Sequence, residues 1–459
     1  DENDSPEEHF TDTIKAACGL ADPNAVWGMT QAAPELVHWL LKLGVKFNMS
    51  GYDDVDLRNF GGQKKKRTAF AQSDTGKQIM TAMIDAVRRK EASGMVERFS
   101  HHSFLTLRLC GNICCGCVIR DEYSQETVEL PGDAVIVAIG GMHGLFGNTT
   151  GSLSNTGEVT AELFRLGVPL ANGEMIQYHP TTVKCGGKRM LISEAARGEG
   201  GRLFAMKDGK QWYFMEEKYP ELGNLMPRDI TAREIWKVSH ESEVFLDMTE
   251  ISEEIISNKL SGLADDCMTY LHKDIRKEPV SVLPGIHYFM GGILVDEQHR
   301  TPIQNLYAAG ECCAQYHGAN RLGGNSLLGA LYGGRVAAKS ACEQADAVDL
   351  SCATQIDFPP ASQISEIKQL NKVMQETMGV VRNENTLLNG IQTVQALTGN
   401  LPLLGMAVLK SALARKESRG AHWREDYPKS NDDDYLKTTV ARFDGKQIQI
   451  SFVPVPERR

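Results

Sequence analysis

Two short apolar runs, each ending in glycine, most constrain how this chain folds. The first is Ala134–Ile139, followed by Gly140-Gly141, and the second is Leu306–Ala309, followed by Gly310-Glu311. Runs without a polar position are typical of strands that are covered on both faces in a parallel sheet. About 165 residues separate the two runs. We therefore expect one parallel-sheet domain that is interrupted by an inserted domain.

The rest of the chain is mixed α/β in its first third and helical after Ala345. Ser5 and Pro6 mark a helix start, and apolar spacing predicts helices over Pro34–Leu43 and Thr75–Lys90. We also expect a hairpin of Phe104–Cys110 and Ile113–Asp121, and a short strand over Gln447–Phe452 near the end. The fold class that this order predicts is α/β, with a Rossmann-like domain that carries an inserted α+β domain.

Composition excludes several classes of protein. The 459 residues correspond to about two to four domains. With 49 basic and 59 acidic residues the net charge is −10, which argues against a nucleic-acid-binding surface. No apolar run reaches the length of about 18–20 residues that spans a bilayer, so we expect membrane contact only through partner subunits.

The 11 cysteines are an odd number, which fits reduced thiols in a cytoplasmic protein better than a disulfide framework. Cys110, Cys114, Cys115 and Cys117 superficially resemble an iron–sulfur ligand set. However, adjacent residues of a strand point to opposite faces, so Cys114 and Cys115 cannot face one cluster. We therefore predict buried free thiols here, and no metal site.

A glycine-rich segment follows the second apolar run. It contains Arg321 and leads to Asn325-Ser326, which can cap a helix that runs on to about Ala345. The first turn of such a helix favours an anion or an electron-rich ring. Glu311, which follows a strand and a glycine, is placed like the carboxylates that bind ribose hydroxyls in dinucleotide folds. A capped helix with a solvent-facing glutamate is the simpler alternative.

Polar residues that suit a carboxylate-binding site lie at both ends of the inserted block. His179 stands where the chain leaves the sheet domain and His287 where it returns, so both can face the cleft between the domains. Together with Arg321 they would form a cationic pocket for a dicarboxylate. Arg228 and Asp229 form a further polar pair, for which a structural ion pair is the alternative.

At these positions the sequence resembles the flavoprotein subunit of succinate dehydrogenase and fumarate reductase, within the FAD-dependent family that includes L-aspartate oxidase. The segments that carry the resemblance are Phe60–Gly62, Asn155–Glu158, His179–Thr181, Glu194–Gly201, Arg228-Asp229, His287–Gly292, Gly318–Leu328 and Glu417–Pro428. The resemblance implies an FAD-binding domain in two parts, 1–176 and 287–345. It also implies a capping domain at 177–286, a helical domain at 346–425 and a small C-terminal segment at 426–459.

The resemblance also implies a role for individual residues. Arg228 matches the arginine that exchanges a proton with fumarate or succinate, and Glu194 and Arg197 match its proton relay. The residues that match the substrate clamp are His179, Ser193, His287 and Arg321, with Ser193 in the place of a usual threonine. The residues that match FAD contacts are Glu158, Glu311, Ser326 and Leu327, with Glu158 in the place of a usual aspartate.

The function implied by the resemblance is the interconversion of fumarate and succinate in electron transport, including anaerobic respiration. Hydride would be exchanged with FAD and electrons with an iron–sulfur subunit, at the cytoplasmic face of the membrane. One expected signal is absent, because no G-x-G-x-x-G follows a strand; Gly198-Glu199-Gly200 is the nearest approach. We therefore expect that the chain begins at the second segment of the FAD domain, with roughly 50–100 residues missing before Asp1.

Two other functions remain open from the sequence. One is L-aspartate oxidase, or another flavin-dependent reductase of an unsaturated carboxylate, although Leu322–Asn325 is closer to the succinate and fumarate branch. The other is a scaffold subunit without flavin, which only the absent glycine motif supports. The presence of Arg228, His179, His287 and Arg321 argues against a scaffold.

Overall fold

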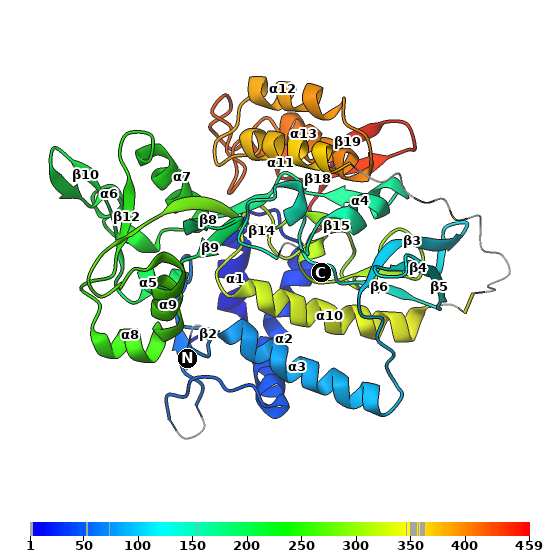
Figure 1. The fold of residues 1–459 in the computed structure, drawn as a ribbon, viewed down its shortest axis with the longest axis horizontal. Helices are drawn as coiled ribbons and strands as arrows, with labels where there is room; N and C mark the ends of the chain where they lie inside the picture. The colour runs from blue at the N-terminus through cyan, green and yellow to red at the C-terminus, as the bar shows by residue number, and fades with distance from the viewer. Residues whose placement is uncertain are drawn as a thin grey trace.

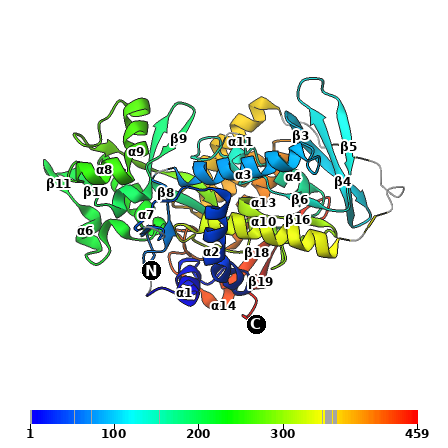
Figure 2. The same ribbon diagram turned by 90° about the horizontal axis from the view of Figure 1, so that it is seen from below.

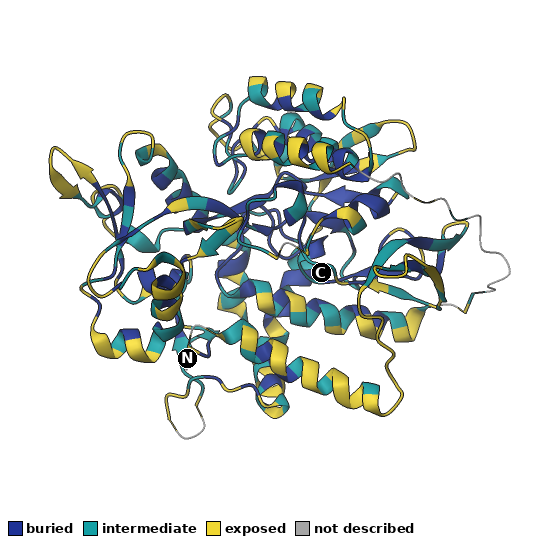
Figure 3. Ribbon diagram, viewed as in Figure 1, coloured by how far each residue is buried: buried dark blue, intermediate teal, exposed yellow. Residues whose placement is uncertain are grey.

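The computed structural model describes residues 3–51, 54–72, 74–152, 154–345, 347–348, 356, 358 and 363–459. Figure 1 shows N-terminal helices below and C-terminal helices above. The segment between the two predicted parallel strands extends to one side, and a small antiparallel sheet lies on the other (Figure 1). Buried residues concentrate where these regions meet, whereas the outer helix faces are exposed (Figure 3).

The predicted parallel pair is present at the centre. β6 (Val135–Val137) pairs with β16 (Leu306–Ala308) in parallel, and Val135 lies opposite Leu306. The long helix α10 (Asn325–Gln344) packs against both strands. The prediction that the first run is covered on both faces is wrong for one of the two faces. Side chains alternate between the faces of a strand, and Ile136 and Ala138, which share the face away from the core, are both exposed, Ile136 by 41%.

The N-terminal helices cover the other side of α10 (Figure 2). They are α1 (Pro6–Ala16), α2 (Pro23–Leu43) and α3 (Thr75–Ala92), with the short strands β1 (Leu57–Arg58) and β2 (Thr68–Ala69) between the last two. Ser5 caps α1, as predicted, by accepting a hydrogen bond from the Glu8 amide. The predicted start of the second helix at Pro34 is wrong. Asp22 caps α2 earlier, and Pro34 lies inside the helix.

The small antiparallel sheet contains the predicted hairpin. Its strands are β3 (His102–Cys110), β4 (Ile113–Asp121) and β5 (Thr127–Pro131), in the order β3-β4-β5. Cys114 and Cys115 are buried free thiols and Cys117 is a partly buried one. Cys110, in contrast, is disulfide-bonded, so the prediction of a free thiol is wrong there.

The segment between the central strands leaves and returns through one antiparallel sheet of order β14-β8-β9. Beyond it lies a second sheet of order β11-β10-β12-β13, with short helices around it and a core of its own. The strands are β8 (Ile176–Cys185), β9 (Lys188–Leu191), β10 (Arg202–Lys207), β11 (Lys210–Trp212), β12 (Val244–Asp247), β13 (Val280–Ser281) and β14 (Leu283–Phe289). The helices are α5 (Glu194–Gly198), α6 (Phe214–Lys218), α7 (Arg228–Val238), α8 (Glu253–Lys259) and α9 (Ser261–Asp266).

A further region joins the C-terminal helices to a sheet of order β17-β15-β7-β18-β19, in which only β18 and β19 come from the C-terminal part of the chain. Its elements are α4 (Glu158–Arg165), β7 (Leu170–Ala171), β15 (Gly292–Leu294), β17 (Cys313–Ala314), α11 (Ile364–Thr377), α12 (Glu384–Val394), α13 (Asn400–Ala414), α14 (Asp432–Tyr435), β18 (Lys437–Phe443) and β19 (Ile448–Pro454). The predicted boundary at residue 346 lies outside the described residues, and the domain limits stay a prediction. In the described part of the chain, no helix combines the length and apolar character that a bilayer crossing requires.

Candidate active site

Three of the predicted catalytic residues form one buried cluster at the start of two short helices. Glu194 is the first residue of α5 and Arg228 the first of α7. The Nε and Nη2 atoms of Arg228 donate to Oε2 of Glu194 at 2.9 and 2.5 Å, and Nη2 of Arg197 donates to Oε1 at 3.2 Å. Burial raises the pKa of Glu194, but the charges of Arg228 and Arg197 more than offset it and hold the pKa to about 2. Arg228 therefore pairs with Glu194, and not with the adjacent Asp229.

Gln177, a fully buried residue on β8, completes this cluster. Its Oε1 accepts from Nη1 of Arg228 at 3.1 Å. Its Nε2 donates to Oδ1 of Asn320 and to the carbonyl of Arg321, both at 3.0 Å. The sequence reasoning assigned no role to Gln177. The signal that would have found it is its spacing of two from His179, which places both side chains on one face of the strand.

The two predicted clamp histidines meet across the paired strands β8 and β14. Their ring centroids are 5.2 Å apart, and His179 lies opposite Gly285 in the register. Burial lowers the pKa of His179 well below its usual value, and the charge of Arg228 lowers it further. Burial and His179 do the same to the pKa of His287. Both rings are therefore neutral near pH 7, so the expected cationic character of the pocket comes from arginines alone.

Arg321 contributes a buried cation on the opposite side of Gln177. Its side chain lies over the ring of Tyr288, with 4.4 Å from Cζ to the ring centroid. Burial, followed by the like charge of Arg228, lowers the pKa of Arg321 to about 9. Its Nε is buried, and no described residue is a hydrogen-bond partner for it. A buried donor without a partner is costly, so a carboxylate bound here would satisfy it.

Ser193 precedes Glu194, and its side chain bonds the backbone of α5. Its hydroxyl accepts from the amide of Ala195 at 3.3 Å and so caps α5. Helix capping by serine is common. The structure therefore places Ser193 beside the cluster through α5, while a role in substrate binding stays a prediction.

Glu311 lies where the carboxyl ends of the central strands meet. Its Oε1 accepts from the Phe289 amide at 3.0 Å. A Cβ atom on Gly141, just after β6, would stand 2.6 Å from the same oxygen, so the close approach requires glycine. Dinucleotide cofactors bind at such a strand edge of parallel sheets, and a carboxylate there binds ribose hydroxyls. The residues present therefore fit the adenosine side of FAD.

The other predicted cofactor contacts lie at helix starts. Glu158 is the exposed first residue of α4, and Ser326 and Leu327 lie in the first turn of α10, where Leu327 is 40% exposed. The predicted cap by Asn325 and Ser326 is wrong. Gly324 takes the cap position without a side-chain bond. The side-chain amide of Asn325 instead forms hydrogen bonds with the side chains of His9 and Thr13 of α1. The first-turn amides of α10 therefore have no side-chain cap.

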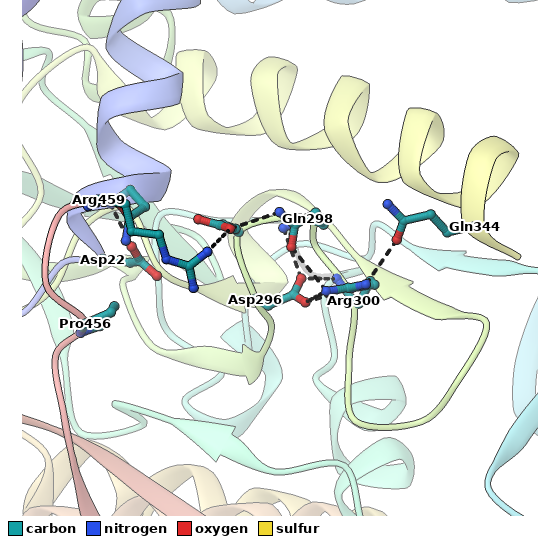
Figure 4. Close-up of a pocket in the computed structure, with 9 residues that line it drawn as sticks. Asp22, Asp296, Gln298, Arg300, Gln344, Pro456 and Arg459 are labelled. Carbon is teal, nitrogen blue, oxygen red and sulfur yellow. Dashed lines mark hydrogen bonds and ion pairs between the residues drawn. The ribbon is translucent and has the colours of Figure 1, made fainter.

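A surface pocket near the C-terminus is separate from this cluster. Figure 4 shows that its charged side chains face one another. Arg300 pairs with Asp296 at 2.7 Å and Arg459 with Glu297 at 3.5 Å. Because these charges compensate each other locally, the buried cluster, and not this pocket, is the candidate active site.

Comparisons with known proteins identify the family. Residues 1–327 match the family described as FAD binding domain, and residues 397–458 match fumarate reductase flavoprotein C-term. The succinate dehydrogenase flavoprotein subunit of Bacillus subtilis is 36% identical, over 100% of this chain and 89% of its own length. The chain belongs to the succinate dehydrogenase and fumarate reductase flavoprotein family. It is an FAD-dependent oxidoreductase of that type.

Other relatives are similar in structure or in sequence. A variant of the E. coli quinol fumarate reductase superposes with a TM-score of 0.89 and 26% identity, covering 99% of this chain and 88% of that chain. The L-aspartate oxidase of Pyrococcus furiosus is 32% identical over 94% of this chain and 86% of its own length. The predicted fold class, a Rossmann-like FAD-binding domain with capping and helical domains, is confirmed by the structural match.

Proposed function

We propose that this flavoprotein interconverts fumarate and succinate, with Arg228 as the group that exchanges the proton. The observation that carries the proposal is the buried contact of Arg228 with Glu194 at 2.5 Å, beside two histidines and a second arginine. An arginine is normally a very poor acid. A buried carboxylate that bonds two arginines at once supplies the partner such a proton exchange requires.

The charge of the cluster suits a dicarboxylate. Arg197, Arg228 and Arg321 carry three positive charges and Glu194 one negative charge, while the histidines are neutral. A C4 dicarboxylate would therefore balance the remaining two positive charges. Arg321 would bind one carboxylate through its unpartnered Nε.

The two histidines would act as neutral hydrogen-bond donors to the other carboxylate. The Nδ1 atom of His287 lies 2.8 Å from Oγ1 of Thr150, whose hydroxyl can donate to it. Where Nδ1 accepts a hydrogen bond, the proton of the neutral ring stays on Nε2, and His287 can then donate from Nε2 to the substrate. The Nδ1 atom of His179 lies 3.2 Å from the Thr181 amide nitrogen and 3.1 Å from the Thr181 carbonyl oxygen, so these contacts allow either tautomer. In the tautomer whose Nδ1 accepts from the amide, His179 can donate from Nε2 as well.

The proton would pass along three side chains. Arg228 would give a proton to fumarate and would regain one from Arg197 through the Glu194 carboxylate, which bonds both arginines; the solvent would be the final source of this proton. In succinate oxidation the same proton would move in reverse. When bound, FAD supplies or accepts the hydride on the other carbon of the double bond. Holding both carboxylates fixes the reacting carbons relative to Arg228, which lowers the entropic part of the barrier.

The cofactor would be held by residues from both parts of the FAD domain. Glu311 would bind the ribose through Oε2. Its Oε1 already accepts a hydrogen bond from the Phe289 amide, and no described residue bonds Oε2 in this way. Gly141 permits the close approach of the Glu311 carboxylate. Ser326 and Leu327 would present the first-turn amides of α10 to the flavin, and Glu158 would contact the cofactor from the start of α4.

We also propose an iron–sulfur subunit as the electron partner and a cytoplasmic location on the membrane through partner subunits. Relatives in Bacillus subtilis and Wolinella succinogenes are named as flavoprotein subunits, which supports assembly with other chains. Such a location fits electron transport in anaerobic respiration. A test is copurification of the tagged protein from membranes with an iron–sulfur protein; recovery of the protein alone from the soluble fraction would contradict it.

The central test of function compares wild-type protein with Arg228→Ala, both loaded with FAD. Wild-type protein should oxidise succinate with an artificial electron acceptor. Arg228→Ala should lose at least about a hundredfold in kcat, the usual contribution of general acid–base catalysis, while it still binds dicarboxylate. Substantial activity of this variant would show that another group exchanges the proton. Oxidation of L-aspartate by oxygen without activity on succinate would assign the protein to the L-aspartate oxidase branch instead.

A further inference from the structure

His143 is a buried histidine to which the proposed reaction gives no role. It follows Gly141 at the carboxyl end of β6, in a single helical turn His143–Leu145, and is 4% exposed. The ring packs edge-on against Phe289 with 5.0 Å between ring centroids. It lies between two groups that the proposed function uses separately, the cofactor carboxylate Glu311 and the clamp residue His287.

One side of the ring faces the cofactor carboxylate. The Nε2 atom of His143 is 3.5 Å from Oε1 of Glu311. The same oxygen accepts from the amide of Phe289, the residue on which the ring packs. With the ring proton on Nε2, this contact would help the amide to hold the Glu311 carboxylate in place.

The other side of the ring fixes a tight loop. The Nδ1 atom of His143 bonds Oγ1 of Thr149 at 2.9 Å, and that oxygen also accepts from the Gly151 amide at 3.2 Å. Gly151 lies directly over the ring, where a Cβ atom would overlap it. The imidazole thus stabilises the loop Thr149–Gly151 by a hydrogen bond to Thr149 and by packing against Gly151.

The middle residue of this loop orients the substrate histidine. The Thr150 hydroxyl bonds Nδ1 of His287 at 2.8 Å, and the Thr150 amide donates to the carbonyl of Ile286 at 3.0 Å. The loop and β14 therefore move together. A change at His143 would displace Thr150 and turn the ring of His287.

We propose that His143 is a positioning residue that couples the cofactor carboxylate Glu311 to the substrate-binding histidine His287 through the loop Thr149–Gly151. The inference rests on the proposed function, because it takes Glu311 as an FAD contact and His287 as a dicarboxylate contact. Coupling between two binding sites is reciprocal, so FAD and dicarboxylate each favour the loop geometry that the other requires.

The experiment compares FAD-loaded wild-type protein with His143→Phe, which keeps a ring but loses both nitrogens. The dissociation constant of fumarate is measured from the change in the flavin absorption spectrum. We expect His143→Phe to raise this constant and KM about tenfold, the loss of one well-placed hydrogen bond, while kcat changes less than threefold. The visible circular dichroism of the flavin should also change, since Glu311 loses a partner. Unchanged fumarate affinity in His143→Phe would overturn the proposal.

Two further variants test separately the contact of His143 with Glu311 and its contact with the loop Thr149–Gly151. Thr150→Val should raise the fumarate constant similarly and leave the flavin circular dichroism as in wild type. His143→Gln keeps a donor and an acceptor and should restore most of the affinity. If Thr150→Val binds fumarate as wild type does, the loop does not carry the coupling and the proposal fails.

The matched control is His299→Phe. His299 is also fully buried and also has both nitrogens bonded, to the Ala308 carbonyl at 2.6 Å and the Tyr316 hydroxyl at 2.5 Å. Its replacement should lower the unfolding temperature without raising the fumarate constant. The spectral titration requires no turnover. Absence of succinate or fumarate turnover in wild type would therefore refute the proposed function, while altered affinity in the variants would still support the coupling.

Discussion

Gln177 offers the sharpest test of how Arg228, the proposed proton donor, is held. Gln177→Met keeps the length and approximate volume of the side chain and removes three hydrogen bonds in a site with no exposed surface. The bond from Arg228 involves a charge and is worth about 1.5–3 kcal/mol, and each neutral bond about 0.5–1.5 kcal/mol. We therefore expect the free energy of unfolding to fall by about 2.5–6 kcal/mol.

The effect of Gln177→Met on catalysis should be smaller than that of removing Arg228. Two bonds to Glu194 still hold the guanidinium, but Nη1 loses the contact that fixes its rotation. Loss of one such contact corresponds to about a tenfold decrease in kcat. Urea unfolding and steady-state kinetics, normalised to bound flavin, measure the two effects.

The control for this variant is Gln315→Met, the same change at another buried glutamine. Gln315 donates to His299 at 2.8 Å and makes none of the three contacts of Gln177. It should lower the free energy of unfolding and leave kcat as in wild type. A kcat within twofold of wild type for Gln177→Met would refute the reasoning that Gln177 positions Arg228.

Three more outcomes follow from the structure. Gly141→Ala places a Cβ atom 2.6 Å from Oε1 of Glu311 and should reduce flavin content at least severalfold after purification, whereas Gly334→Ala, which meets open space, should retain it. Burial holds the pKa of His287 below the value of 6.5 that it has in the unfolded chain. Below pH 6.5 the unfolded chain binds a proton at this ring that the folded protein does not bind. The free energy of unfolding is therefore unaffected by this group above pH 6.5 and falls by about 1.4 kcal/mol per pH unit below it. Urea unfolding from pH 7 to 5 should show a shallower loss in His287→Gln, and an equal slope would contradict this. Ser193→Ala should cost about 1 kcal/mol of stability through the lost helix cap, measured by urea unfolding, while Ser193→Thr should keep both stability and activity.

The sequence predicted the centre of the fold because its signals there do not depend on context. A run such as Ala134–Ile139, without polar residues and closed by two glycines, fits few structures other than a buried strand. It did not predict where α2 begins, since Pro34 looks like a first helical residue and only the completed helix shows it to be internal. Ile136 was misjudged because an apolar residue does not reveal whether its own face is covered.

The candidate site was predicted in part for similar reasons. Residues in long motifs, such as His179 and Arg228, could be selected from a resemblance. Gln177 and His143 could not, since a glutamine in a strand or a histidine after a glycine pair carries no signal by itself. Their importance comes from partners more than a hundred positions away along the chain, such as Arg321 for Gln177 and Glu311 for His143.

The parallel pairing of β6 with β16 also determines when this protein can fold. Val137, the last residue of β6, and Leu306, the first residue of β16, are 169 positions apart in the chain. At about 5–20 residues per second, a ribosome delivers the second strand roughly 10–30 s after the first. During that interval the nascent chain carries an apolar strand without its partner, which is a species prone to aggregation. Chaperone demand during synthesis should therefore be greatest before residue 306 emerges.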